Sequence, residues 1–209
     1  MGVPVGAETE YQLNASLLEK HWNKATVAAL LAAPSNPTGT LVPRENLQAM
    51  SDAVQSRGGR LVVDEIYHGL IYEGNVGTAL SLSDDLFVIN SFSKYFCMTG
   101  WRLGWLVAPE AYVRELDKLA QNIFLAAPTI AQHAALATFA PEAQAILNKR
   151  RDVYRQRLNF SYTQSVTLVC MFWLCHMGHL CILATYTRLT LSVVFRAITC
   201  YLHVVIPCS

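Results

Sequence analysis

The stretch from Ser91 to Gly104, SFSKYFCMTGWRLG, brings three kinds of chemistry together. Lys94 directly follows the hydroxyl residue Ser93 and lies three residues after a second one, Ser91, and Arg102 follows later among glycines. A lysine amine can form a Schiff base with an aldehyde, whereas hydroxyls and a guanidinium can bind a phosphate dianion. A small molecule that carries both an aldehyde and a phosphate is pyridoxal 5'-phosphate. The stretch therefore supports the hypothesis of a site for that cofactor.

Two other interpretations of the stretch are open at this point. A lysine beside serines can simply be a solvated surface residue. Ser91 and Lys94 also have the S-x-x-K spacing of serine acyl enzymes such as β-lactamases. Those enzymes need S-D-N and K-T-G elements as well, and the sequence contains neither. The choice among these interpretations depends on the rest of the chain.

The composition divides the 209 residues into two unlike parts. Of the 31 Asp, Glu, Lys and Arg residues, 29 precede Ser161, whereas five of the six cysteines follow it. The first part has the balance of a cytoplasmic enzyme, with Cys97 as its single thiol, and the N-terminus has no signal-peptide pattern. The net charge of +1 and the lack of a basic run give no indication of nucleic-acid binding. We therefore expect one folded unit over 1–160 and an atypical tail over 161–209.

The apolar, Cys-rich tail has three interpretations. No charged residue occurs from Leu158 to Thr187, a length that would suffice for a transmembrane helix. A zinc site is a second idea, but the spacing of the candidate ligands fits no standard pattern; these are Cys175, His176, His179 and Cys181. The interpretation that we favour is an out-of-frame or otherwise aberrant end. Membrane association and a metal site are thus not favoured.

Apolar runs and turn signals predict strands that alternate with helices along 1–160. The expected strands are 26–33, 60–63, 86–90 and 103–107, with the end of another at 3–5. The expected helices are 16–22, 43–57, 109–121, 129–139 and 141–160. Ser16 and Glu19 have the spacing of a capping box at the first of these helices. The alternation predicts an α/β fold, a three-layer α/β/α sandwich around a mostly parallel sheet.

Polar residues follow three of the predicted strands. Asn36, Asp64 and Lys94 each come just after a strand end, and in parallel sheets that edge is where ligands bind. A pyridoxal cofactor needs a carboxylate for its ring nitrogen, for which Asp64 is the candidate. Its phenolic oxygen needs donors, for which Asn36 and Tyr67 are the candidates. Ser91, Ser93 and Arg102 are the candidates for the phosphate.

Each of these residues also has an ordinary interpretation. Asp64 can be a solvated loop carboxylate, and Tyr67 can be a packing residue. Asn36 precedes a proline and can be a turn former, while Arg102 can belong to a surface ion pair. These alternatives remain open as long as each residue is considered alone.

Three motifs together resemble class I/II aminotransferases of fold type I, the aspartate-aminotransferase-like enzymes. They are N-P-T-G at 36–39, D-E-I-Y at 64–67 and SFSKYFCMTGWRLG at 91–104. The resemblance covers about 3–160 and implies the cofactor-binding large domain of that family. It also implies truncation at both ends, because the upstream phosphate loop and the downstream substrate-binding arginine of the family have no counterpart that we can place. Family members are usually homodimers.

The resemblance implies a reaction as well as a fold. Lys94 would carry pyridoxal phosphate as a Schiff base and move a proton between substrate and cofactor, with an amino acid and a 2-oxo acid as substrates. Two alternatives are a non-catalytic fragment that retains cofactor binding and a C–S lyase of the same fold. As implied by the resemblance, Tyr67 and the T-G-W-R-L-G-W segment favour the aminotransferases over the lyases. The amino donor is not predicted.

Overall fold

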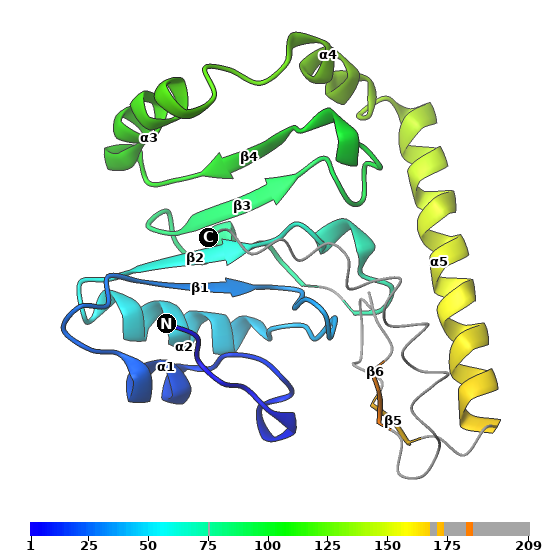
Figure 1. Ribbon diagram of the computed structural model, residues 1–209, viewed down its shortest axis with the longest axis horizontal. Coiled ribbons are helices and arrows are strands. Elements are labelled where there is room, and N and C mark those ends of the chain that lie inside the picture. The colour runs from blue at the N-terminus through cyan, green and yellow to red at the C-terminus, as the bar shows by residue number, and fades with distance from the viewer. Residues whose placement is uncertain (75, 168–170, 174–182, 186–209) are drawn as a thin grey trace.

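The computed structural model describes residues 1–74, 76–167, 171–173 and 183–185 (Figure 1). Within these residues a four-stranded sheet has the order β1-β2-β3-β4, as Figure 1 shows from bottom to top. Its strands are β1 (Ala28–Ala32), β2 (Arg60–Asp64), β3 (Phe87–Ser91) and β4 (Gly104–Val107). The first three are parallel and β4 is antiparallel to β3, so the sheet is mixed but mostly parallel, as predicted.

Helices and short 3-10 turns connect and flank the strands. The helices are α1 (Ala15–His21), α2 (Arg44–Gln55), α3 (Glu110–Ile123), α4 (Thr129–Ala137) and α5 (Pro141–Thr167). The 3-10 turns are η1 (Ala7–Thr9), η2 (His68–Leu70), η3 (Ala79–Ser81) and η4 (Thr99–Trp101). A separate antiparallel pair consists of β5 (Met171–Trp173) and β6 (Leu183–Thr185).

The core lies between α2 and one face of the sheet. Leu61 and Val63 of β2 are 1% and 0% exposed, and they meet Met50 and Val54 of α2, both fully buried. Because side chains alternate along a strand, Leu31 points into this core while its neighbour Leu30 is 67% exposed on the other face. Each such buried side chain contributes about 1.5–3 kcal/mol relative to exposure. This packing fixes the sheet that carries the loops after β1, β2 and β3.

Helix α3 reaches the opposite face of the sheet. Tyr112 of α3 packs edge-on against Phe87, with ring centroids 5.2 Å apart, and its hydroxyl accepts a hydrogen bond of 3.1 Å from Arg60 Nε. Arg60 neighbours the buried Leu61 along β2, so its side chain points away from α2. Helices therefore contact both faces, as expected for helical layers around a central sheet.

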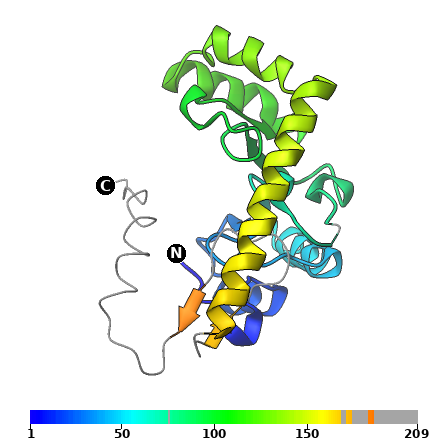
Figure 2. The same cartoon turned by 90° about the vertical axis from the view of Figure 1, so that its right-hand side faces the viewer.

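Helix α5 stands at the end of the sheet toward which the three parallel strands run. Figure 2, which looks along the strands from that side, shows α5 in front of the strand ends. The helix ends at Thr167 rather than at the predicted residue 160. Among the described residues, no helix is both long enough and apolar enough to cross a membrane, and no cluster of potential metal ligands occurs. The candidate zinc ligands and 14 of the 30 residues of the uncharged stretch lie outside the described residues.

Two local predictions are wrong. Residues 3–5 form no strand in the structure, and Pro4 gives a reason, since proline lacks the N–H that a strand ladder needs. The first helix begins at Ala15, and its cap is Asn14, whose side-chain oxygen accepts a bond of 2.9 Å from Leu17 N. Asn14 is as good a cap as serine and comes earlier in the chain, so the capping box at Ser16 does not form.

Candidate active site

Three strand ends present polar residues at one edge of the sheet. Asp64 is the last residue of β2 and lies in register with Ala32 of β1 and Ile89 of β3. Asn36 follows β1 and Lys94 follows β3, both in loops that start at the same edge. Parallel strands of similar length bring their carboxyl ends together, so residues from separate parts of the sequence converge here.

Asn36, Tyr67 and Lys94 form one chain of contacts. The Asn36 amide donates a hydrogen bond of 3.2 Å to the Tyr67 hydroxyl. Lys94 Nζ lies 5.5 Å from the centre of the Tyr67 ring, within the range of a cation–π contact. Tyr67 is 5% exposed, whereas Asn36 and Lys94 are exposed. A buried, fixed phenol is thus flanked by an amide and an amine that remain accessible to a ligand.

The Lys94 side chain has no other polar partner among the described residues. Its side-chain amine takes part in no hydrogen bond and no ion pair there, whereas its backbone carbonyl accepts a hydrogen bond of 3.0 Å from the Cys97 N–H. A lysine amine without a carboxylate beside it is available to react with an aldehyde, since no counter-ion holds it in place.

The two serines of the loop after β3 form a second contact. Their hydroxyl oxygens lie 2.8 Å apart, and the backbone N–H of Ser93 donates to Ser91 Oγ at 2.9 Å. Ser91 Oγ also lies 3.2 Å from the Leu103 carbonyl oxygen, at the start of β4. The hydroxyl pair is therefore tied to the backbone on both sides of the loop.

Arg102 ends the η4 turn in a left-handed conformation, with φ of 53°. Its guanidinium donates to the Thr99 carbonyl at 3.0 Å, and the Thr99 hydroxyl donates to the Ser93 carbonyl at 2.6 Å. In the part of the chain that the structure describes, Arg102 has no carboxylate partner and no hydrogen bond to either serine. It is exposed, on the same loop as the hydroxyl pair, and free to bind an anion.

Asp64 is half-buried and is not joined directly to the other candidates. Its Oδ1 accepts a hydrogen bond of 3.0 Å from the Ile66 N–H, which fixes the carboxylate at the strand end. Within the described residues, Oδ2 accepts no hydrogen bond and is left for a donor from a ligand.

Glu65 is a residue of this region whose role the sequence reasoning missed. It is 4% exposed and accepts hydrogen bonds from the Ala79 N–H at 2.6 Å and from the Thr78 hydroxyl at 2.9 and 3.1 Å. Its other contact is His68 Nδ1, 3.4 Å from Oε2. The alternation of buried Leu61 and Val63 along β2 was the available signal, because it continues onto position 65. Through these hydrogen bonds Glu65 joins η3 to the turn that carries Tyr67.

His68 is held in a partly buried position next to this carboxylate. Burial lowers the pKa of His68 below its ordinary value, while the Glu65 carboxylate and a hydrogen bond with the Ala33 backbone offset part of that effect. Ala33 belongs to the loop that leads to Asn36. His68 therefore links the turn after β2 to the loop after β1.

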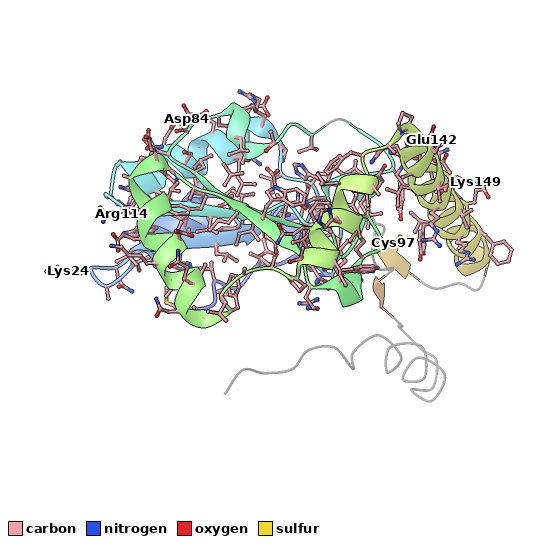
Figure 3. All side chains as sticks on the ribbon, turned by 90° about the horizontal axis from the view of Figure 1, so that it is seen from above. Lys24, Asp84, Cys97, Arg114, Glu142 and Lys149 are labelled. Carbon is pink, nitrogen blue, oxygen red and sulfur yellow. The ribbon has the colours of Figure 1, made fainter. Side chains whose placement is uncertain are left out.

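Figure 3 shows how the site relates to the rest of the molecule. Seen from above, Cys97 of the Lys94 loop lies toward the end of the molecule where α5 carries Glu142 and Lys149, whereas Arg114 of α3 lies at the far end. The candidate residues therefore gather at the α5 end of the sheet.

Comparison with known proteins points to one family. Residues 2–171 match the family described as aminotransferase class I and II. The chain is 41% identical over 145 residues to valine–pyruvate aminotransferase of Mycobacterium tuberculosis, a match that covers 68% of this chain and 37% of the relative. It is 35% identical over 171 residues to aspartate aminotransferase of Sulfurisphaera tokodaii, covering 75% and 43%.

Solved structures give the same result for the fold. The crystal structure of an aminotransferase from Mycobacterium tuberculosis superposes with a TM-score of 0.81 at 34% identity, covering 87% of this chain and 47% of that one. The chain thus spans less than half the length of these relatives. Since the family match extends over most of its residues, the chain belongs to the family of class I and II aminotransferases.

Proposed function

We propose that this chain carries the cofactor-attachment site of a pyridoxal-phosphate-dependent aminotransferase, which moves an amino group between an amino acid and a 2-oxo acid. The observation that carries the proposal is the contact chain in which the Lys94 amine lies against Tyr67, itself bonded to Asn36. Pyridoxal phosphate, when bound, supplies an electron sink for the carbon that bears the amino group.

The available donors and acceptors fit that cofactor. Lys94 and Arg102 are exposed cations without a carboxylate partner among the described residues, one suited to an aldehyde and the other to a phosphate. The paired hydroxyls of Ser91 and Ser93 lie on the same loop. A structural ion-pair network would instead have neutralised these cations.

Lys94 is the residue that we assign to proton movement. Its Nζ lies beside the face of the buried Tyr67 ring, which limits the directions that the side chain can take. From there the amine would hold the cofactor covalently and, once displaced from it by the substrate amine, would accept and return the proton of the substrate carbon.

The remaining candidates orient the ring. The Tyr67 hydroxyl and the Asn36 amide are donors for its phenolic oxygen, and their mutual bond of 3.2 Å keeps both in place. The free Oδ2 of Asp64 would accept from the protonated ring nitrogen, while Oδ1 is held by the Ile66 N–H. Each of these groups is already fixed by a partner, so little reordering is needed on binding.

The same proposal assigns the parts of the chain. We take 1–160 as a partial cofactor-binding large domain and 161–209 as an atypical tail, of which the family match includes only 161–171. We propose a cytoplasmic homodimer for the whole enzyme. A second candidate function is cofactor binding without turnover. The chain spans 37% of the length of one relative and 43% of another.

Borohydride reduction tests the proposal. The purified chain is mixed with pyridoxal phosphate, reduced, digested and mapped by mass spectrometry. We expect the pyridoxyl group on Lys94, and its loss in Lys94→Ala. The other lysines serve as internal controls; they are Lys20, Lys24, Lys118 and Lys149. Equal labelling of those lysines, or labelling that survives Lys94→Ala, would refute the assignment.

A further inference from the structure

Tyr95 directly follows Lys94, and its side chain touches two other elements. The phenol oxygen lies 3.2 Å from Gln144 Oε1 and 3.0 Å from Asn148 Oδ1. Gln144 and Asn148 are four residues apart on α5 and so share one face of that helix. The ring rests on Gly69, where an added Cβ would lie 2.3 Å from Tyr95 Cγ. Tyr95 therefore fills the space between the η2 turn and α5.

The hydrogen bonds of this contact have a defined direction. Gln144 Nε2 donates to the Thr138 carbonyl at 2.7 Å, so Gln144 Oε1 is the group that faces Tyr95 and accepts its single proton. Asn148 Oδ1 lies 3.0 Å from the same hydroxyl and is a second acceptor for that proton. The Tyr95 hydroxyl therefore donates to a pair of amide oxygens on one face of α5.

Neighbouring residues of the Lys94 loop thus hold the same turn from two sides. Lys94 lies over the ring of Tyr67, and Tyr95 lies on Gly69, two residues further along that turn. The Lys94 side chain has no polar partner of its own among the described residues. Its direction therefore depends on the Tyr67 ring and on the backbone, which Tyr95 ties to α5.

A second contact joins α5 to the chain beyond this turn. Tyr72 lies three residues after Gly69 and is half-buried. Burial raises the pKa of the Tyr72 phenol, nearby Tyr154 adds to this rise, and Arg151 opposes it. Tyr154 and Arg151 both belong to α5, so the helix also lies near this chain segment independently of Tyr95.

We propose that Tyr95 is a positioning residue that couples α5 to the Lys94 loop, so that the placement of α5 sets the direction of the Lys94 amine. The inference rests on the proposed function only for the role of Lys94, since the contacts of Tyr95 stand by themselves. A shift of α5 relative to the sheet would move the Tyr95 side chain and, through the backbone, the neighbouring Lys94.

The test uses the 209-residue chain and the Tyr95→Phe variant, which keeps the ring but removes both hydrogen bonds. The pyridoxyl fraction at Lys94 after reduction is measured against the concentration of pyridoxal phosphate. We expect the half-saturating concentration to rise about two- to tenfold, the factor that one hydrogen bond commonly supplies. The control is Tyr112→Phe, which also loses a hydrogen bond, that from Arg60, but at the far end of the sheet.

A double-mutant comparison shows whether Tyr95 acts through α5. The pair Gln144→Ala and Asn148→Ala should give the same rise, and adding Tyr95→Phe should change it no further. The Gln144→Ala and Asn148→Ala pair also tests the coupling if Tyr95→Phe fails to fold. Hydrogen exchange of the cofactor-free chain should increase in both the Lys94 loop and the first turns of α5 in Tyr95→Phe, but not in Tyr112→Phe.

The outcomes separate the two proposals. Normal labelling and exchange in Tyr95→Phe, or losses that simply add to those of the α5 pair, would overturn the coupling. Absence of label at Lys94 in the unmodified chain would refute the proposed function instead, and the exchange measurement would still decide on the coupling.

Discussion

Replacing Glu65 by alanine removes a carboxylate that is 4% exposed and accepts hydrogen bonds from η3. Ala79, whose N–H donates at 2.6 Å, is fully buried, so no water replaces the lost acceptor. Thr78 is only partly buried, and its hydroxyl can turn to solvent. The change therefore leaves one buried donor without a partner and releases η3 from the turn that carries Tyr67.

The size of the effect follows from these contacts. A hydrogen bond to a charged group contributes about 1.5–3 kcal/mol, and a buried donor left unsatisfied costs a similar amount. The Thr78 and His68 contacts add less because both residues are partly exposed. We expect Glu65→Ala to lower the free energy of unfolding by about 2–4 kcal/mol, a large share of the roughly 5–15 kcal/mol of a typical domain.

Urea unfolding at neutral pH measures this loss, with circular dichroism as the signal. Glu115→Ala is the matched control, because Glu115 pairs with Lys118 at 2.6 Å on an exposed helix face; its loss should cost less than about 0.5 kcal/mol. Glu65→Gln keeps an acceptor for the Ala79 N–H and should fall between the two. If Glu65→Ala is no more destabilising than Glu115→Ala, Glu65 does not fasten η3.

Three further predictions follow from the site. Asp64→Ala should weaken pyridoxal phosphate binding by about tenfold or more, the value of a charge-assisted hydrogen bond, but should lower stability less than Glu65→Ala does. Fluorescence titration measures the binding and urea unfolding measures the stability. Equal binding losses in the two variants would contradict the assignment of Asp64. The pKa of His68 is lowered in the folded chain, so its contribution to stability is fully present above the unfolded pKa of about 6.5 and declines as the pH falls below that value. Below pH 6.5 the urea midpoint of His68→Asn should therefore depend less on pH than that of the unmodified chain. The same dependence of the midpoint on pH in both proteins would contradict the lowered pKa. Gly69→Ala should destabilise the chain by about 1–3 kcal/mol because the added methyl group meets the Tyr95 ring. Gly100→Ala is the control, since open space surrounds Gly100 and thermal stability should change little. Similar melting temperatures of the two variants would disprove the packing of Tyr95 on Gly69.

Local patterns in the sequence were sufficient for most of the elements. The apolar run before Asn36 predicts β1, and the helix that begins after Pro43 is observed as Arg44–Gln55. These elements depend on hydrogen bonds and side-chain periods within a few residues of the chain, which a sequence displays directly. The motifs around Asn36, Asp64 and Lys94 likewise indicated the family, because each is a short contiguous stretch.

Contacts between distant residues were decided only by the tertiary structure. Asn36 and Tyr67 are 31 residues apart, and Tyr95 and Asn148 are 53 apart. Nothing local in the sequence specifies such a pair, since it depends on how the strand ends and α5 pack together. For the same reason Glu65, adjacent to Asp64, is buried under η3 while Asp64 stays at the sheet edge: strand alternation sends one side chain into the core and the other toward the site.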